Sequence, residues 1–468
     1  MKTIPRSVSR AALLAALLLP ALPACSGEAA YEGPPVVVIG LDGMTWDVAE
    51  PLLEQGRMPH LAALLERGVG GDLQTSIPTF SPRLWTTIAT GVPADEHGIL
   101  YFSEIGEDGR PVPKGLPYTS NSRKVPAIWN LAGDAGRRVD SVAWWVSWPA
   151  EQVPDARIVA SYAAQVQAAI LWKPIVWDDG LPELTWPPEL AQEIDPILFE
   201  GRPNGPLVEE YNERFGKINP GWKVPYERDR LFRGTYHADV THKEIFLGML
   251  AEDEPADLSM VYFGLPDVAG HFFWRYREPE AYNYRVPPRM VERIGDHIDK
   301  AYLAVDDWIG EIVATLPADA VVLLVSDHGM GPANLNNEKA AQSGAHENGP
   351  PGLIVLAGPT VEPRGLLPRG ERSIGTIMDV TPFLLDLLRI PGDPRLTGRS
   401  LRGLMTPTWQ EAHPELPRLE EAVPFRAPTP PREPGEGMSD VFLENLDELG
   451  YIDSGTDGPP EGTGQQGR

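Results

Sequence analysis

The stretch VVVIGLDGM, residues 36–44, gives the first indication of the fold class. Its run of β-branched side chains is typical of a parallel strand that is buried on both faces. Similar apolar runs recur as LSMVYFG before LPD, as AVVLLV before SDHG, and as GLIVLAG at residues 352–358. Helical patterns such as HLAALLERG, RLWTTIATG and DVTPFLLDLL lie between them. The sequence therefore predicts an α/β fold with a mostly parallel central sheet flanked by helices on both faces.

An aspartate follows each of the first three runs within a few residues, as Asp42, Asp267 and Asp327. In open sheets of this kind, ligands bind beyond the carboxyl ends of the strands. We therefore expect the three carboxylates to gather at one edge of the sheet.

The remaining sequence divides by composition. A helical and irregular cap, rich in tryptophan, is expected at about residues 100–257, and its tryptophans are expected to pack rather than bind. Proline-rich, amphipathic and polar stretches follow the catalytic domain. The predicted segments are a signal peptide (1–24), a linker (25–35), the catalytic domain (36–403), a proline-rich linker (404–437), a short helix (438–453) and a disordered tail (454–468).

The first residues predict export, because a basic start precedes an apolar run too short to span a bilayer permanently. Cys25, the one cysteine of the chain, follows this run in LPAC, which resembles the lipobox of bacterial lipoproteins. We expect lipid on Cys25 and an anchor at the bacterial cell envelope, on the periplasmic or cell-surface side. The alternative is an ordinary secretory signal cleaved near Ala24, with Cys25 incidental.

The net charge of −26 disfavours a nucleic acid polymer or an anionic membrane surface as a partner. Removal of residues 1–24 takes away Lys2, Arg6 and Arg10 and no acidic residue, so the mature charge is −26 − 3 = −29. An enzyme for anionic substrates would need a local cation against this field, and a bound metal ion could supply it.

Six residues are candidate metal ligands, since zinc takes histidine nitrogen and carboxylate oxygen and a catalytic pair needs two half-sites facing one substrate. Singly, each has an ordinary explanation as a capping aspartate or a core histidine. Together they are more specific, because two stand four residues apart and could share a helix face, and two are adjacent at a strand end. The six are Asp42, Asp267, His271, Asp327, His328 and His346.

A candidate nucleophile lies in TSIPTFSPRLWTTIATG, residues 75–91. Ser81 followed by Pro82 predicts a serine at the N-cap of a helix, where unpaired backbone N–H groups could also hold a phosphoryl oxygen. A plain capping serine is the alternative, and this segment alone favours it. Thr79 is a rival nucleophile two residues upstream.

The ordered set of motifs resembles the alkaline phosphatase superfamily, and within it the type I phosphodiesterase and nucleotide pyrophosphatase group. The matching strings are VIGLDGM, SPRLWTTIATGVPADEHGI, FGLPDVAGH, VSDHGM and GAHENGPPGLIVLAGP, and the resemblance covers about residues 36–403. It implies an alkaline phosphatase-like fold and hydrolysis of a small phosphate ester, with Ser81 as nucleophile and two zinc ions rather than manganese. It places Asp42, Ser81, Asp327 and His328 around one ion, and Asp267, His271 and His346 around the other.

The sequence departs from the nucleotide pyrophosphatases at one position. They carry an asparagine a few residues after HGI, whereas HGILYFSE places Phe102 there, which disfavours a nucleotide substrate. The leaving group and the oligomeric state stay open. The alternatives are a phosphomonoesterase, a sulfatase, a manganese-dependent phosphoglycerate mutase and a non-catalytic binding lipoprotein. A sulfatase would need a cysteine, or a serine in the S-x-P-S-R context, whereas Ser81 of this chain lies in SPRLW. The export signal argues against the mutase.

Overall fold

The computed structural model describes residues 31–103, 118–164, 183–201, 205–217, 225–251 and 255–425 of the chain. The signal peptide, Cys25, the short helix and the tail predicted above lie outside the described residues. The described strands are β1 (Val36–Leu41), β2 (Gly68–Gln74), β3 (Val139–Val142), β4 (Ala156–Val159), β5 (Thr185–Trp186), β6 (Leu258–Phe263), β7 (Val321–Val325), β8 (Gly331–Pro332), β9 (Gly344–Ala345), β10 (Gly352–Ala357), β11 (Gly365–Leu366) and β12 (Ser373–Thr376).

Ten of these strands form one sheet, in the order β11-β2-β10-β7-β1-β6-β3-β4-β5, with β12 also paired to β2. The central strands β6, β1 and β7 are parallel, and β10 runs antiparallel to both β7 and β2. Every residue of these four strands is buried, as their predominantly apolar runs predict. The predicted α/β class with a mostly parallel sheet is confirmed.

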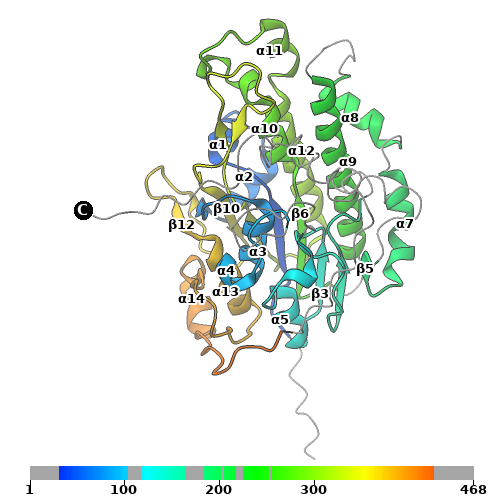
Figure 1. The fold of residues 1–468 in the computed structure, drawn as a ribbon. Coiled ribbons are helices and arrows are strands. Elements are labelled where there is room, and N and C mark those ends of the chain that lie inside the picture. The colour runs from blue at the N-terminus through cyan, green and yellow to red at the C-terminus, as the bar shows by residue number, and fades with distance from the viewer. Residues whose placement is uncertain are drawn as a thin grey trace, which may run out of the picture. The chain divides into compact units, whose positions relative to one another are not determined.

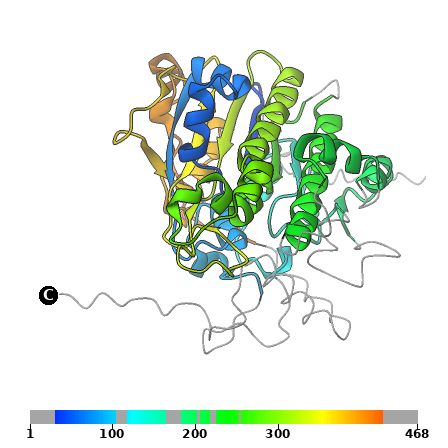
Figure 2. The same ribbon diagram turned by 90° about the horizontal axis from the view of Figure 1, so that it is seen from above.

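Helices cover the sheet on either side, and Figures 1 and 2 show their arrangement. They are α1 (Trp46–Glu54), α2 (Pro59–Glu66), α3 (Ser81–Thr90), α4 (Ala94–His97), α5 (Ile128–Asp134), α7 (Leu190–Glu200), α8 (Leu207–Phe215), α9 (Pro225–Leu250), α10 (Leu265–Arg277), α11 (Pro288–Ile294), α12 (His297–Thr315), α13 (Val380–Leu387) and α14 (Pro407–Ala412). Short 3-10 helices are η1 (Ser120–Ser122), η2 (Pro279–Ala281), η3 (Ile377–Asp379) and η4 (Arg402–Leu404). Among the described helices, none has the length and apolar character needed to cross a membrane.

Two strands of the sheet fall within the region expected to be a cap. β3 pairs with β6, and β4 pairs with β3, so both extend the central sheet. Each has only four residues and carries a charged side chain, which breaks the apolar pattern that a buried strand normally shows. Asp140 of β3 and Arg157 of β4 neutralise one another through two contacts of 2.8 and 2.7 Å. The helices α7, α8 and α9 do follow, with 11, 9 and 26 residues.

The folded part of the chain continues past residue 403, where the sequence predicts a linker. η4 and α14 lie there, Met405 forms an isolated β-bridge with Val361, and Trp409 is buried. Further on, the Val423 amide donates to Asp393 at 2.8 Å. Proline content suggested a linker, but these specific contacts hold the segment against the domain.

Candidate metal centre

The carboxyl ends of three neighbouring parallel strands bring three aspartates together. Asp42 directly follows β1, and Asp327 lies two residues beyond β7. Asp267 is the third residue of α10, which begins after β6. All three side chains are buried. The gathering of carboxylates that the sequence predicts at one sheet edge is therefore what the structure shows.

The first group of ligand atoms joins Asp42, Asp327 and His328. The Nε2 atom of His328 lies 3.4 Å from Asp42 Oδ1 and 3.4 Å from Asp327 Oδ2. Those two oxygens and this nitrogen are buried and have no hydrogen-bond partner among the described residues. The other oxygen of Asp42 is fixed, because it accepts from Tyr262 at 2.6 Å and from Trp85 at 3.0 Å.

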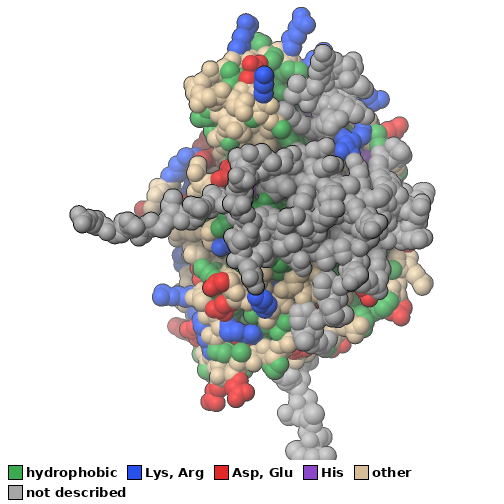
Figure 3. All heavy atoms as spheres, viewed as in Figure 1, with side chains coloured by type: hydrophobic (Ala, Val, Ile, Leu, Met, Phe, Trp, Pro, Cys, Tyr) green, Lys and Arg blue, Asp and Glu red, His purple; other side chains and the backbone are tan. Residues whose placement is uncertain are grey.

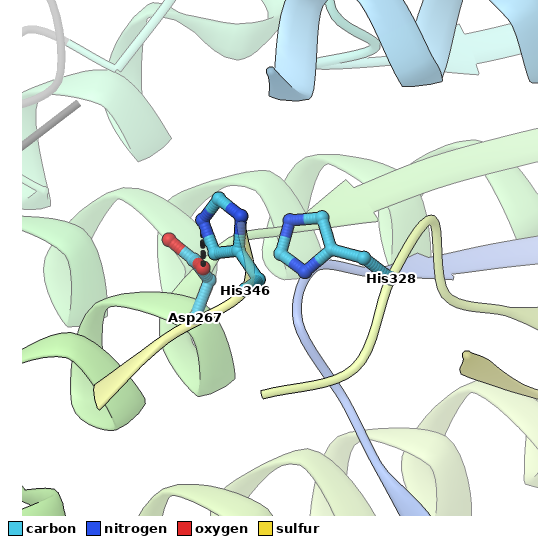
Figure 4. Close-up of side chains that lie close together, drawn as sticks. All are labelled: Asp267, His328 and His346. Carbon is cyan, nitrogen blue, oxygen red and sulfur yellow. Dashed lines mark ion pairs between the residues drawn. The ribbon is translucent and has the colours of Figure 1, made fainter. Parts of the chain in front are cut away.

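A second group joins Asp267, His271 and His346. Asp267 and His271 stand one turn apart on α10, with Nε2 of His271 at 3.4 Å from Asp267 Oδ1. His346 comes from the loop between β9 and β10, and its Nε2 lies 3.2 Å from Nε2 of His271 and 3.8 Å from Asp267 Oδ1. Figure 4 shows His346 between Asp267 and His328.

The two groups adjoin each other. The rings of His328 and His346 stack with their centroids 3.9 Å apart. One ligand atom each from Asp267, His328 and His346 lie within 4.8 Å of one another, as do those of Asp42, Asp327 and His328. His328 can therefore reach either position. The predicted pairing of each residue with one of two ions stays a prediction.

Hydrogen bonds at Nδ1 set the protonation of the site histidines. Nδ1 of His271 lies 3.0 Å from the Gly344 carbonyl oxygen, and Nδ1 of His328 lies 3.0 Å from that of Gly329. Because a carbonyl oxygen only accepts, both Nδ1 atoms carry hydrogen and both Nε2 atoms carry a lone pair in the neutral ring. This is the form in which histidine binds a metal ion.

The donor set fits divalent metal ions such as zinc. Ligands at two tetrahedral zinc–nitrogen bonds of about 2.0–2.1 Å would be about 3.3 Å apart, close to the separations within both groups. Burial, with His328 and His271 nearby, lowers the pKa of His346 well below its usual value, so this ring is neutral. Burial, with Asp42 and Asp267 nearby, raises the pKa of Asp327 well above its usual value. Bound cations would relieve this repulsion between carboxylates.

Gly43 allows the strand ends to come this close. Its φ is +66°, and a Cβ added there would lie 2.9 Å from the Cα of Asp267. Any other residue would be strained at this φ and would push α10 away. The glycine of the LDG motif thus sets the distance between the two groups.

Ser81 is the first residue of α3, and Phe80 occupies the N-cap without a side-chain capping bond. The predicted capping serine is therefore displaced by one position, and its hydroxyl does not cap the helix. Ser81 Oγ is buried and has no partner among the described residues. Trp85, one turn later, donates to Asp42, which puts this face of α3 against the first group.

Thr79 contacts the second group directly. Its hydroxyl lies 3.1 Å from the backbone oxygen of His346 and 2.9 Å from Nδ1 of the same residue. A hydroxyl engaged in this way is held in place, whereas that of Ser81 is not. The structure thus distinguishes the two candidate nucleophiles by their hydrogen bonds.

Sequence reasoning missed the residues that support the ligands. Tyr262 and Trp85 hold Asp42, and Ser326 donates to the His328 carbonyl at 2.7 Å while accepting from the Met44 amide at 3.0 Å. The available signal was position, since Tyr262 immediately precedes the motif FGLPDVAGH and Ser326 lies within VSDHGM. Phe102 is buried against Phe80, at a centroid distance of 6.0 Å, so no amide occupies that place.

A family model described as type I phosphodiesterase / nucleotide pyrophosphatase matches residues 36–364, which is more than half of the chain. The chain belongs to this family. The phosphodiesterase family lies within the alkaline phosphatase superfamily, whose fold the structure shows. Membership establishes a hydrolase family, and the buried aspartates and histidines are a set that could bind its metal ions.

Individual relatives of this phosphodiesterase-family chain are distant. A 2,3-bisphosphoglycerate-independent phosphoglycerate mutase of Desulforudis audaxviator (strain MP104C) is 28% identical over 166 residues, which are 35% of this chain and 27% of the mutase. The chain therefore spans about a quarter of the length of that relative. The structure of human ectonucleotide pyrophosphatase / phosphodiesterase 5 is 14% identical, with a TM-score of 0.47, over 80% of this chain and all of that one. The structure of the inactive murine ectonucleotide pyrophosphatase / phosphodiesterase 5 in complex with AMP is 14% identical, with a TM-score of 0.45, over 80% of this chain and all of that one.

Proposed function

We propose that the protein is a two-zinc phosphodiesterase that uses Ser81 as its nucleophile. One observation carries the proposal: three carboxylates and three histidine Nε2 atoms converge in a buried cluster, beside a helix whose first residue has an unengaged hydroxyl. A binding lipoprotein that had lost catalysis would be expected to have lost some of these groups. All seven are present.

Six residues of this chain would hold the two metal ions. Asp42, Asp327 and His328 would hold one zinc ion near Ser81, and Asp267, His271 and His346 would hold the other. When bound, zinc would stabilise charge on the phosphoryl oxygens and favour the alkoxide of Ser81. Tyr262 and Trp85 orient Asp42, so that its other oxygen faces the cluster.

The reaction would proceed in two displacements. Ser81 Oγ forms a bond to phosphorus while the bond from phosphorus to the leaving-group oxygen breaks, and the leaving group departs as an alcohol after taking a proton. Water then attacks the phosphorus of the resulting serine phosphodiester, which still carries the second ester group, and this step releases a phosphate monoester and restores the Ser81 hydroxyl. The N-terminus of α3 would hold a phosphoryl oxygen through backbone N–H groups.

We expect diesters to be better substrates than monoesters. A monoester dianion needs additional positive charge, and two arginines that could be considered for this role, Arg83 and Arg123, are engaged in other contacts. Arg123 contacts both carboxylate oxygens of Glu151 at 2.8 Å, and Arg83 donates to Ser76 Oγ and to the Pro78 carbonyl at 2.9 Å. The net charge of −26 also disfavours the dianion more than the monoanion.

The test compares matched aryl esters on the full chain, with and without zinc. We expect bis(4-nitrophenyl) phosphate to be hydrolysed faster than 4-nitrophenyl phosphate, and 4-nitrophenyl sulfate to be hydrolysed little or not at all. Chelation should remove the activity and zinc should restore it. A clear preference for the monoester would contradict the diester assignment, and activity without transition metal would contradict the whole proposal.

A further inference from the structure

We propose that Thr79 is a positioning residue that fixes His346 in its metal-binding tautomer. The inference rests on the function proposed above, because it concerns one ligand of the second metal group. Thr79 is buried in the loop between β2 and α3, and its hydroxyl contacts His346 twice, at the backbone oxygen and at Nδ1.

The directions of these two hydrogen bonds follow from their chemistry. The threonine hydroxyl has one hydrogen, and a carbonyl oxygen can only accept, so the 3.1 Å contact is donated by Thr79 to the His346 backbone. The 2.9 Å contact must then be donated by Nδ1–H of the imidazole to the hydroxyl oxygen. The proton is therefore on Nδ1, and the lone pair is on Nε2.

The lone pair on Nε2 points into the second group. This atom lies 3.2 Å from Nε2 of His271, whose own proton is on Nδ1 beside the Gly344 carbonyl. Two ring nitrogens without hydrogen thus face each other at a distance suited to one shared cation. The opposite tautomer of His346 would put a hydrogen where the ion belongs.

Thr79 differs from the other groups that set the site tautomers. His271 and His328 use backbone carbonyl oxygens, which a side-chain substitution does not remove. Nδ1 of His346 instead donates to a side chain, the hydroxyl of Thr79. A single substitution at residue 79 can therefore release this histidine alone.

Thr79→Val removes the hydroxyl at nearly constant volume, and Thr79→Ser keeps it. Loss of such a supporting hydrogen bond typically weakens metal binding about 10- to 100-fold. We expect Thr79→Val to bind one zinc ion as wild type does and the second about 10- to 100-fold more weakly, and Thr79→Ser to retain both affinities. Thr90→Val is the matched control, because it removes a buried hydroxyl on α3 that bonds the Thr86 carbonyl at 2.7 Å.

The measurement is a zinc titration of the full chain against a competing chelator, for all four proteins. Nitrogen-15 spectra of the histidine rings in the metal-free proteins give a second reading that is independent of zinc. Wild type and Thr79→Ser should show His346 protonated on Nδ1, and Thr79→Val should show mixed tautomers. If the valine variant does not fold, Thr79→Ala takes its place under the same criteria.

Wild-type affinity for both ions in Thr79→Val would overturn this inference and leave the proposed phosphodiesterase intact. An equal loss in Thr90→Val would also overturn it, since the effect would then be one of general packing. Wild-type protein that binds no zinc would instead defeat the proposed function itself.

Discussion

At the residue scale, buried histidines outside the metal centre make stability depend on pH. Burial lowers the pKa of His242 to about 3, against about 6.5 in an unfolded chain. The folded state therefore resists protonation that the unfolded state accepts. The contribution of the neutral His242 ring to the free energy of unfolding is fully present above about pH 6.5. It is lost as the pH falls toward 3, by about 1.4 kcal/mol per pH unit.

Replacement of His242 should reduce this acid sensitivity. We expect His242→Leu to flatten the slope of the unfolding free energy between pH 6 and pH 4 by up to about 1.4 kcal/mol per pH unit. The comparison uses metal-free protein, so that loss of metal contributes nothing to the slope. Denaturant unfolding at several pH values measures it, and an unchanged slope would show that the ring is protonated in the folded state.

The nucleophile assignment also belongs to this scale. Ser81→Ala should lose several orders of magnitude in rate, because neither the metal ions nor the helix N-terminus can replace the missing oxygen. Its stability should change by less than the roughly 1 kcal/mol that a lost helix cap costs, since Ser81 makes no capping bond. Zinc content should stay near that of wild type. Turnover, bound zinc and thermal midpoint, measured side by side, check all three expectations.

At the element scale, one carboxylate ties the long helix α9 to the start of α10. Asp239 Oδ2 accepts from the Gly264 amide at 2.9 Å and from the Leu265 amide at 2.8 Å. It therefore satisfies two amides at the helix start, two residues before the Asp267 ligand. Burial raises its pKa well above the usual value, and these two bonds partly oppose that rise.

Asp239→Ala should lower both stability and zinc affinity, and Asp239→Asn should restore part of each. Every buried N–H left unpaired costs about 1–3 kcal/mol. A matched control exists in Asp306 of α12, which accepts from the His60 and Leu61 amides at the start of α2. Asp306→Ala should show a similar loss of stability with zinc binding unchanged. Equal zinc loss in both variants would contradict a local role for Asp239.

Elements could be predicted from sequence where burial alone determined the pattern. β1, β6 and β7 are mostly apolar runs, each followed by a helix or by a ligand motif, and a parallel arrangement places Asp42, Asp267 and Asp327 together. β3 and β4 escaped prediction because Asp140 and Arg157 interrupt them and are neutralised only by their mutual contact. The supporting role of Thr79 could not be predicted, because its partner, His346, is 267 positions away in the sequence.

At the scale of the whole molecule, the membrane anchor and the effect of the net charge on substrate choice are proposals. Side chains of both signs occur around the described part of the face in Figure 3, although the chain total is −26. We propose that the protein is exported and anchored through lipid on Cys25. Wild type should partition into detergent and Cys25→Ser into the aqueous phase, with equal hydrolytic activity. Recovery of both proteins in the aqueous phase would contradict the anchor.

Because the net charge is negative, we expect kcat/KM to depend on the salt concentration. If the field of the whole protein repels a monoanionic diester, added salt should screen that repulsion and raise kcat/KM. A neutral salt series between about 0.01 and 0.15 M covers Debye lengths from about 30 to 8 Å. A fall in kcat/KM over this range would indicate that attraction by the site dominates.

The proposed mechanism requires that Ser81 becomes covalently phosphorylated during turnover. Rapid acid quenching of wild-type protein with bis(4-nitrophenyl) phosphate, followed by peptide mass spectrometry, tests it most directly. We expect a 4-nitrophenyl phosphoryl group on Ser81 that is absent in Ser81→Ala and in zinc-free protein. The same group on Thr79, or full turnover by Ser81→Ala, would contradict it.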